Sequence, residues 1–204
     1  RSAANANDPQ DAVRTYDAYV AKYGKQKGQD ERIVEAHLRA GQLYEKLRNT
    51  NAARKAYGAS VSEAAKRRVG GAFAAQAQLA LAEMAFRDYE DIRIEGTSKQ
   101  QQASIPKRAN ALTKVRDEYQ RVFPFKQAEW TLASLYRIGN LYETFADALF
   151  AAPPPPEVKK LGPDFVEEYR VLLEEKAVPL EDKAVDAYKR TLAEAKRMAA
   201  RLQS

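Results

Sequence analysis

The chain has 204 residues, of which 45% are apolar, as expected for one ordinary globular domain. It contains no Cys, which excludes disulfide frameworks, thiolate metal sites and cysteine nucleophiles. The net charge is +6, and residues 1–70 hold 14 Lys and Arg against 8 Asp and Glu. A basic excess favours an acidic partner or an anionic surface, although solvated helix faces are its commoner cause.

Neither a membrane span nor a signal peptide is visible. The longest weakly polar stretch, residues 70–82, is too short to cross a bilayer and is interrupted by Gln76 and Gln78. The chain opens at Arg1 without an initiating Met, so we expect a fragment or a processed form.

Helical periodicity dominates the first half of the chain. Asp8 and Pro9 predict a helix start, and the apolar spacing that follows predicts a helix to Tyr23, ended by Gly24. The next expected helices cover residues 31–47, then the stretch between the turn at 49–51 and the break at 70–71, then residues 72–94. A polar stretch at 96–104 is expected to be a loop.

The second half continues this pattern, with helices expected at 106–122 and 127–150 on either side of a turn at Pro124. The proline run 153–156 cannot be helical and predicts a stiff polyproline spacer. A helix from about 163 to 176 and another from Pro179 to about 202 complete eight helices. No segment shows the alternation of a strand, so the fold class is all-α.

Three of these expected helices align with one another, over residues 36–44, 77–85 and 134–142. Small and apolar residues recur at matching positions, which are Ala36/Ala77/Ser134, Gly41/Ala82/Gly139, Leu38/Leu79/Tyr136, Ala40/Leu81/Ile138 and Leu43/Met84/Leu141. A small residue allows a neighbouring helix to approach closely, and such a face is buried only when repeated copies stack.

This pattern resembles the tetratricopeptide repeat (TPR) family, whose repeats place a small residue and then an aromatic in the first helix and Ala-x3-aromatic-x2-small in the second. The residues that carry the resemblance are Gly41, Tyr44, Ala53, Tyr57 and Ser60, then Gly139 and Tyr142, then Ala184, Tyr188 and Thr191, and also Ala12, Tyr16 and Tyr19. The chain departs from the family in having Ala85 where the second repeat needs an aromatic. The spacing from Gly41 to Ala82 is 41 residues, against a family period of about 34.

The resemblance implies helix-turn-helix repeats stacked into a right-handed superhelical solenoid, as one domain over 1–204. A disordered tail at 1–8 would precede a half repeat at 9–24, and three repeats would follow at 30–68, 71–123 and 127–203, the last with a proline-rich insertion at 151–178. The half repeat has no first helix before it, so we expect the chain to come from a longer repeat protein. Its helix at 9–23 should be less protected than the others or covered by another molecule.

A narrower resemblance runs from Glu129-Trp130 through residues 139–146, and again through 173–177 and 179–184 to Tyr188. These stretches are similar to divergent repeats of large bacterial cell-envelope proteins, including those of gliding-motility machinery. The resemblance implies a periplasmic or cell-envelope location, with the cytoplasm as the alternative.

The TPR resemblance further implies a protein-binding groove lined by the first helix of each repeat. Carried over by position, its residues are Leu38, Gln42, Glu45, Leu79, Glu83, Phe86, Tyr136, Asn140 and Glu143. Their mixed amide, carboxylate and apolar chemistry suits an extended or helical peptide. The expected partner is therefore another protein, such as a subunit of an envelope complex, rather than a small-molecule substrate.

Other functional classes find less support. His37 is the only His, so neither a metal site nor an acid–base pair is expected from it, and no cofactor or catalytic constellation is predicted. The run Lys66-Arg67-Arg68 is typical of cations at a helix C-terminus, although it could contact nucleic acid. The sequence thus favours a non-enzymatic protein-binding scaffold, with a nucleic-acid-binding helical repeat that uses the basic N-terminal third as the alternative.

Overall fold

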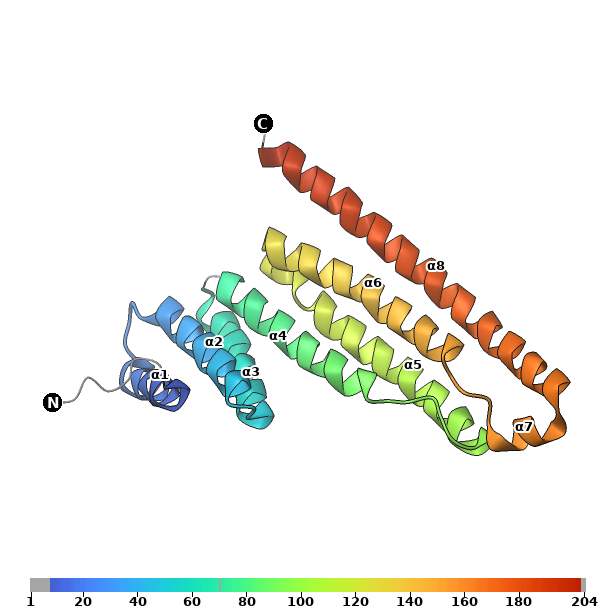
Figure 1. The fold of residues 1–204 in the computed structure, drawn as a ribbon. Coiled ribbons are helices and arrows are strands. Elements are labelled where there is room, and N and C mark those ends of the chain that lie inside the picture. The colour runs from blue at the N-terminus through green and yellow to red at the C-terminus, as the bar shows by residue number, and fades with distance from the viewer. Residues whose placement is uncertain (1–7, 70, 203–204) are drawn as a thin grey trace. The chain divides into compact units, whose positions relative to one another are not determined.

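The computed structural model describes residues 8–69 and 71–202, which form eight α-helices and one 3-10 turn and contain no strand (Figure 1). The helices are α1 Pro9–Tyr23, α2 Asp30–Lys46, α3 Thr50–Arg67, α4 Gly71–Glu90, α5 Ser98–Gln120, α6 Ala128–Phe150, α7 Pro156–Leu161 and α8 Pro163–Leu202, and the 3-10 turn η1 is Phe123–Phe125. The predicted all-α class is confirmed for this part of the chain. Most of the expected tail at 1–8 lies outside the described residues.

The chain divides into two compact units, residues 1–84 with 121–130 and residues 85–120 with 131–204. In the first unit, α1 packs on α2 and α2 on α3. Side-chain caps set two of the helix starts, because the Asp8 carboxylate accepts from Gln10 N at 2.9 Å and the Asn49 side chain accepts from Ala52 N at 3.1 Å. The helix α1 has the predicted bounds, and α3 begins within the predicted turn because Asn49 caps it.

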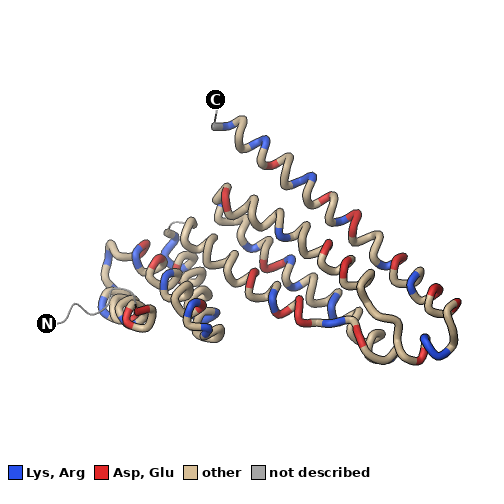
Figure 2. The backbone as a smooth tube through the Cα atoms, in the orientation of Figure 1, with Lys and Arg blue, Asp and Glu red and all other residues tan. Residues whose placement is uncertain are grey.

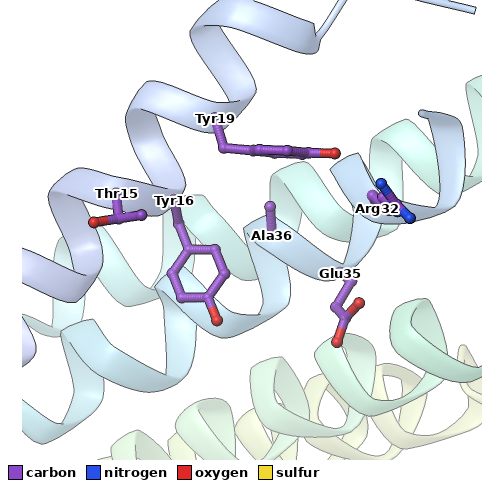
Figure 3. A pocket seen from close by; sticks show the side chains of 6 residues that line it. All are labelled: Thr15, Tyr16, Tyr19, Arg32, Glu35 and Ala36. Atoms are coloured by element: carbon purple, nitrogen blue, oxygen red, sulfur yellow. The ribbon is translucent and has the colours of Figure 1, made fainter. Parts of the chain in front are cut away.

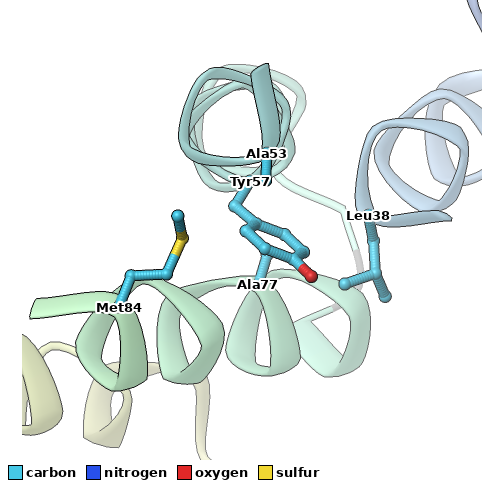
Figure 4. Close-up of a cluster of buried hydrophobic side chains, with 5 residues drawn as sticks. All are labelled: Leu38, Ala53, Tyr57, Ala77 and Met84. Atoms are coloured by element: carbon cyan, nitrogen blue, oxygen red, sulfur yellow. The ribbon is translucent and has the colours of Figure 1, made fainter. Parts of the chain in front are cut away.

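The core of the first unit forms around one tyrosine (Figure 4). The side chain of Tyr57 on α3 lies among Leu38 of α2 and Ala77 and Met84 of α4, with Ala53 one turn before it on α3. The alanines leave room for the ring between closely packed helices, as the predicted small-residue pattern requires.

The passage from α4 to α5 differs from the prediction. The helix α4 ends at Glu90 instead of Ile94, and the predicted loop at 96–104 is wrong because α5 already begins at Ser98. A reciprocal capping box sets this start: Gln100 N donates to Thr97 Oγ1 at 3.3 Å, and Thr97 N donates to Gln100 Oε1 at 2.7 Å.

Two prolines lie inside helices, Pro106 in α5 and Pro179 in α8. The prediction that Pro179 opens a separate helix is wrong, since α8 runs unbroken over 40 residues. Each proline deprives the carbonyl four residues earlier of its donor. Both prolines are exposed, as are Gln102 and Glu175 at those earlier positions, so water can solvate the two carbonyls.

The proline run is largely as predicted. Residues 153–155 are not helical, and Pro155 has the polyproline angles φ −55° and ψ 149°. Pro156 departs from the prediction because it occupies the first position of α7, where a missing N–H costs nothing. The run is anchored by buried Gln101, whose Nε2 donates to Pro153 O at 2.8 Å.

In the second unit, α6 and α8 run antiparallel (Figure 1). A buried arginine, Arg108 of α5, joins neighbouring segments by donating to the carbonyls of Ile92 at 2.5 Å and Thr144 at 3.3 Å. Its guanidinium lies 4.4 Å from the ring centroid of Tyr89, whose pKa burial raises to about 12. The unit is thus held partly by a buried cation that hydrogen-bonds carbonyl groups and contacts an aromatic ring.

Candidate protein-binding surfaces

A close contact between a glycine and a tyrosine joins α2 to α3. The ring of Tyr57 lies so near Gly41 that a Cβ built on the glycine would be 2.5 Å from ring atoms. The Tyr57 hydroxyl donates to Glu45, one turn after the glycine, at 2.6 Å. We call this arrangement of glycine, tyrosine and glutamate a clasp.

The second unit contains the same clasp between α6 and α8. A Cβ on Gly139 would lie 2.6 Å from the Tyr188 ring, and the Tyr188 hydroxyl donates to Glu143 at 2.5 Å. Burial first, and then the hydrogen bond to Glu143, raise the pKa of Tyr188. Glu143 follows Gly139 by four residues, as Glu45 follows Gly41, so the pattern that recurs in the sequence also recurs as a set of contacts.

The aligned position on α4 lacks the carboxylate. Phe86 replaces the glutamate, and its ring centroid lies 6.5 Å from that of Tyr119 on α5. The Tyr119 hydroxyl instead accepts from Arg137 Nε at 3.3 Å, and the Arg137 guanidinium lies 4.2 Å from the Phe86 ring centroid.

Two residues predicted to line the groove are buried in the protein interior. Leu38 is fully buried in the core around Tyr57, and Phe86 is only 2% exposed. Their apolar side chains stabilise helix packing, and a partner could not reach them. The family register assigned both to the surface because it fixes position along a helix and not the depth to which neighbours cover it.

The predicted polar groove residues are held by neighbouring side chains. Gln42 accepts from Arg39 at 3.3 Å, and Asn140 accepts from Arg137 at 2.6 Å, so both amides have an arginine partner three residues earlier. The two glutamates, Glu45 and Glu143, accept from the clasp tyrosines.

The other three predicted groove residues differ in exposure. Leu79 and Glu83 on α4 are half-buried. Tyr136 on α6 is 53% exposed, and its ring centroid lies 5.5 Å from that of Tyr188. Tyr136 on α6 therefore exposes an aromatic ring at the position that buried Leu38 occupies on the aligned helix α2.

A hollow of about 290 Å³ lies between α1 and α2 (Figure 3). Its lining comes from one face of each helix and consists of Thr15, Tyr16 and Tyr19 of α1 and Arg32, Glu35 and Ala36 of α2. Two further bonds hold the helices beside it, from the Tyr19 hydroxyl to Gln29 at 2.7 Å and from the Tyr44 hydroxyl to Asp17 at 3.1 Å.

The hollow was not predicted from the sequence, although Tyr16 and Tyr19 are among the residues that carry the TPR resemblance. Both are only half-buried, and Val13 is the only buried residue of α1. The small side chain of Ala36 lies opposite the two tyrosines (Figure 3). The sequence signal for the hollow was a pair of aromatic residues on one helix, Tyr16 and Tyr19, followed by a small residue, Ala36, on the next helix.

Several cations of the basic N-terminal third are neutralised locally. Arg67 donates to Asp30 and Glu63, both at 2.6 Å, and to the carbonyl of Gly24. Lys66 also pairs with Glu63 at 3.3 Å, and the bond from Arg67 is the main cause that lowers the Glu63 pKa. Lys66 and Arg67 lie in the last turn of α3, and Arg68 is its C-cap, so all three lie at a helix C-terminus, where cations are favourable.

His37 is half-buried on α2, and burial lowers its pKa despite the opposing charges of Glu63 and Asp17. Within residues 8–69 and 71–202, no group of three or more His, Asp or Glu side chains is placed to hold a metal ion. None of the helices in this described part combines the length and apolar character needed to cross a membrane.

Comparison of the chain with protein-family models, curated proteins and solved structures gives no match in any of the three.

Proposed function

We propose that this chain is a non-enzymatic TPR-like repeat that binds another protein, and that the hollow between α1 and α2 receives a side chain of that partner. The observation that carries the proposal is the hollow itself, which combines two tyrosine rings with a cation and a carboxylate.

The hollow has room for a side chain of a bound peptide. At about 290 Å³ it lies at the lower end of the roughly 300–1,000 Å³ typical of ligand sites. One apolar or aromatic side chain from a longer peptide would fill it, while the rest of the peptide followed α2.

The chemistry of the lining suits the same occupant. The rings of Tyr16 and Tyr19 can bury an apolar side chain, and exposed Arg32 can bind a carboxylate or a carbonyl of the partner. Tyrosine and arginine are the residue types in which binding energy at protein interfaces is concentrated. Along α2, the Arg39–Gln42 pair offers further hydrogen-bonding groups.

The repeat architecture is supported by the two clasps, which place the same three residue types in the same contacts. Each clasp buries the contact between a first and a second helix, as stacking of TPR-like units requires. On this basis we propose that the TPR-like repeats form a right-handed solenoid, with the proline-rich insertion in the last repeat. The partner would be a subunit of a bacterial envelope complex, such as a gliding-motility complex, an assignment supported only by the sequence resemblance.

In-cell photo-crosslinking followed by a binding titration tests this proposal. A photoreactive residue in place of Arg32 should capture one protein, and the purified partner should lose most of its affinity for Arg32→Glu. Lys55→Glu is the matched control, because Lys55 is also exposed but lies on α3. Equal affinity of the partner for both variants would contradict the site.

A single-stranded oligonucleotide serves as the second ligand in that titration. The pairing of Lys66 and Arg67 with carboxylates leaves fewer free cations for nucleic acid. Binding of the oligonucleotide that weakens steeply with salt and is reduced by Lys55→Glu would favour the nucleic-acid alternative.

A further inference from the structure

The long helix α8 carries an apolar stripe whose side chains are only about half covered by the rest of the described chain. Val171, Val178, Val185 and Leu192 follow one another at intervals of seven residues, and each is 44–58% exposed. Residues seven apart on a helix are displaced by only about 20°, so the four side chains form one line. A different face of α8 is buried within the unit, at Leu173, Ala177 and Ala184. A helix at the edge of a domain needs only one apolar face to pack against that domain. The stripe is a second apolar face, which indicates that another molecule covers it.

A line of charges beside the stripe changes sign halfway along the helix. This line begins at Glu168, three residues before Val171, and continues at intervals of seven residues with Glu175, Asp182, Lys189 and Lys196. The helix as a whole follows the same division, with seven acidic and two basic residues in 163–182 and two acidic and six basic residues in 183–202. Figure 2 shows these charges along the backbone of α8.

The helix dipole does not explain this division. Acids near an N-terminus and bases near a C-terminus are stabilised, but only within about one turn of each end. On α8 the sign changes between Asp182 and Lys183, near the middle of a 40-residue helix.

From the stripe and its flanking charges we infer that α8 is the interface of an antiparallel homodimer, in which a second copy of this chain covers the stripe. Reversing one copy about a two-fold axis between residues 181 and 182 places Val178 opposite Val185 and Val171 opposite Leu192, because each pair is equidistant from the axis. The same reversal places Glu175 beside Lys189 and Glu168 beside Lys196 to within one residue. The symmetry produces each pair twice, which gives a closed dimer.

The pattern fits other occupants less well. A parallel copy would place Glu168 and Glu175 against their own equivalents, and like charges repel. A membrane surface attracts helices whose polar face is uniformly basic, and the first half of α8 is acidic. An antiparallel copy pairs the acidic half of the charge line with the basic half, and only Asp182, next to the axis, lies near its own equivalent.

Sedimentation equilibrium of the 204-residue chain tests the dimer. The chain should sediment as a dimer, and Val178→Glu combined with Val185→Glu should make it a monomer with an unchanged helical circular dichroism spectrum. The control is Leu161→Glu combined with Phe165→Glu, because these side chains are as exposed but lie off the stripe. A monomeric native chain, or a dimer that survives both glutamates on the stripe, would overturn the proposal.

Cysteine crosslinking tests the direction of pairing, and the absence of native Cys makes it clean. In an antiparallel dimer, position 171 lies opposite 192 of the other copy, about 31 Å along the helix from its own equivalent at a rise of 1.5 Å per residue. A chain with Val171→Cys and a chain with Leu192→Cys should therefore crosslink when mixed, and neither should crosslink alone. Crosslinking of each variant with itself would show parallel pairing and refute the proposal.

Charge reversal tests the flanking pairs. Glu175→Lys and Lys189→Glu should each weaken the dimer by about tenfold, because each replaces two attractions by two repulsions at an exposed site. The double variant restores opposite charges at both sites and should recover most of the native affinity. Additive weakening in the double variant would contradict the proposed register.

Discussion

Tyr57 lies against Gly41 with no room for a side chain on the glycine, since a Cβ there would be 2.5 Å from the ring. The contact is backed by the hydrogen bond from Tyr57 to Glu45. The absence of a side chain on Gly41, together with the size of the Tyr57 side chain, thus determines how closely α2 and α3 approach each other.

Adding a methyl group at this contact should destabilise the protein. Gly41→Ala and Gly139→Ala each force a tyrosine ring to move, so we expect losses of about 1–3 kcal/mol in the free energy of unfolding. Gly58→Ala on α3 is the control, because a Cβ there meets nothing within 4 Å. This control should be neutral or stabilising by up to about 1 kcal/mol. Chemical denaturation measures all three, and equal effects at Gly41 and Gly58 would show that the clasp is not closely packed.

Removing the tyrosine hydroxyl tests the polar half of the clasp. Tyr57→Phe leaves the ring in place and removes a bond to a carboxylate, so it should cost about 1–2 kcal/mol. Tyr188→Phe should cost less, because its acceptor Glu143 is exposed to water. A double-mutant cycle of Tyr57→Phe with Glu45→Gln should show coupling between the two residues, and strict additivity would argue against the bond.

The buried arginine of the second unit should matter more than its exposed neighbour. Arg108→Met removes the donors to Ile92 O and Thr144 O and should cost about 2–3 kcal/mol. Lys107→Met changes the same charge at an exposed position and should remain within about 0.5 kcal/mol of the native protein. Thermal or urea melts that rank the two variants the other way would contradict the assigned role.

Stability should fall in mild acid because of His37. Burial lowers its folded-state pKa, so the unfolded chain binds a proton more readily than the folded one. The free energy of unfolding should therefore decrease as the pH falls from the ordinary His value of about 6.5 towards the lowered folded pKa. His37→Gln removes this contribution and should flatten that part of the profile. An unchanged slope in the variant would assign the acid sensitivity to another group.

Helices with clear caps and a continuous apolar face were predictable from the sequence, as α1 shows with both ends correct. The errors arose where a local signal was outweighed or overlooked. Thr97 and Gln100 form a capping box that the Gln-rich composition concealed, and Pro179 stays inside α8 because the buried residues on either side of it form one continuous face. The depth of Leu38 and Phe86 could not be read from their helical register, because burial depends on which neighbours cover a position.

The central claim is that a partner protein binds in the hollow between α1 and α2. Amide hydrogen exchange of the chain, measured with and without the partner that photo-crosslinking identifies, tests this claim most directly. In the free chain, α1 should exchange faster than α2, because Val13 is its only buried residue. Partner binding in the hollow should slow exchange across Pro9–Tyr23 and Asp30–Lys46 and leave α7 unchanged. Unchanged exchange in α1 and α2, with protection appearing elsewhere in the described chain, would contradict binding at this hollow.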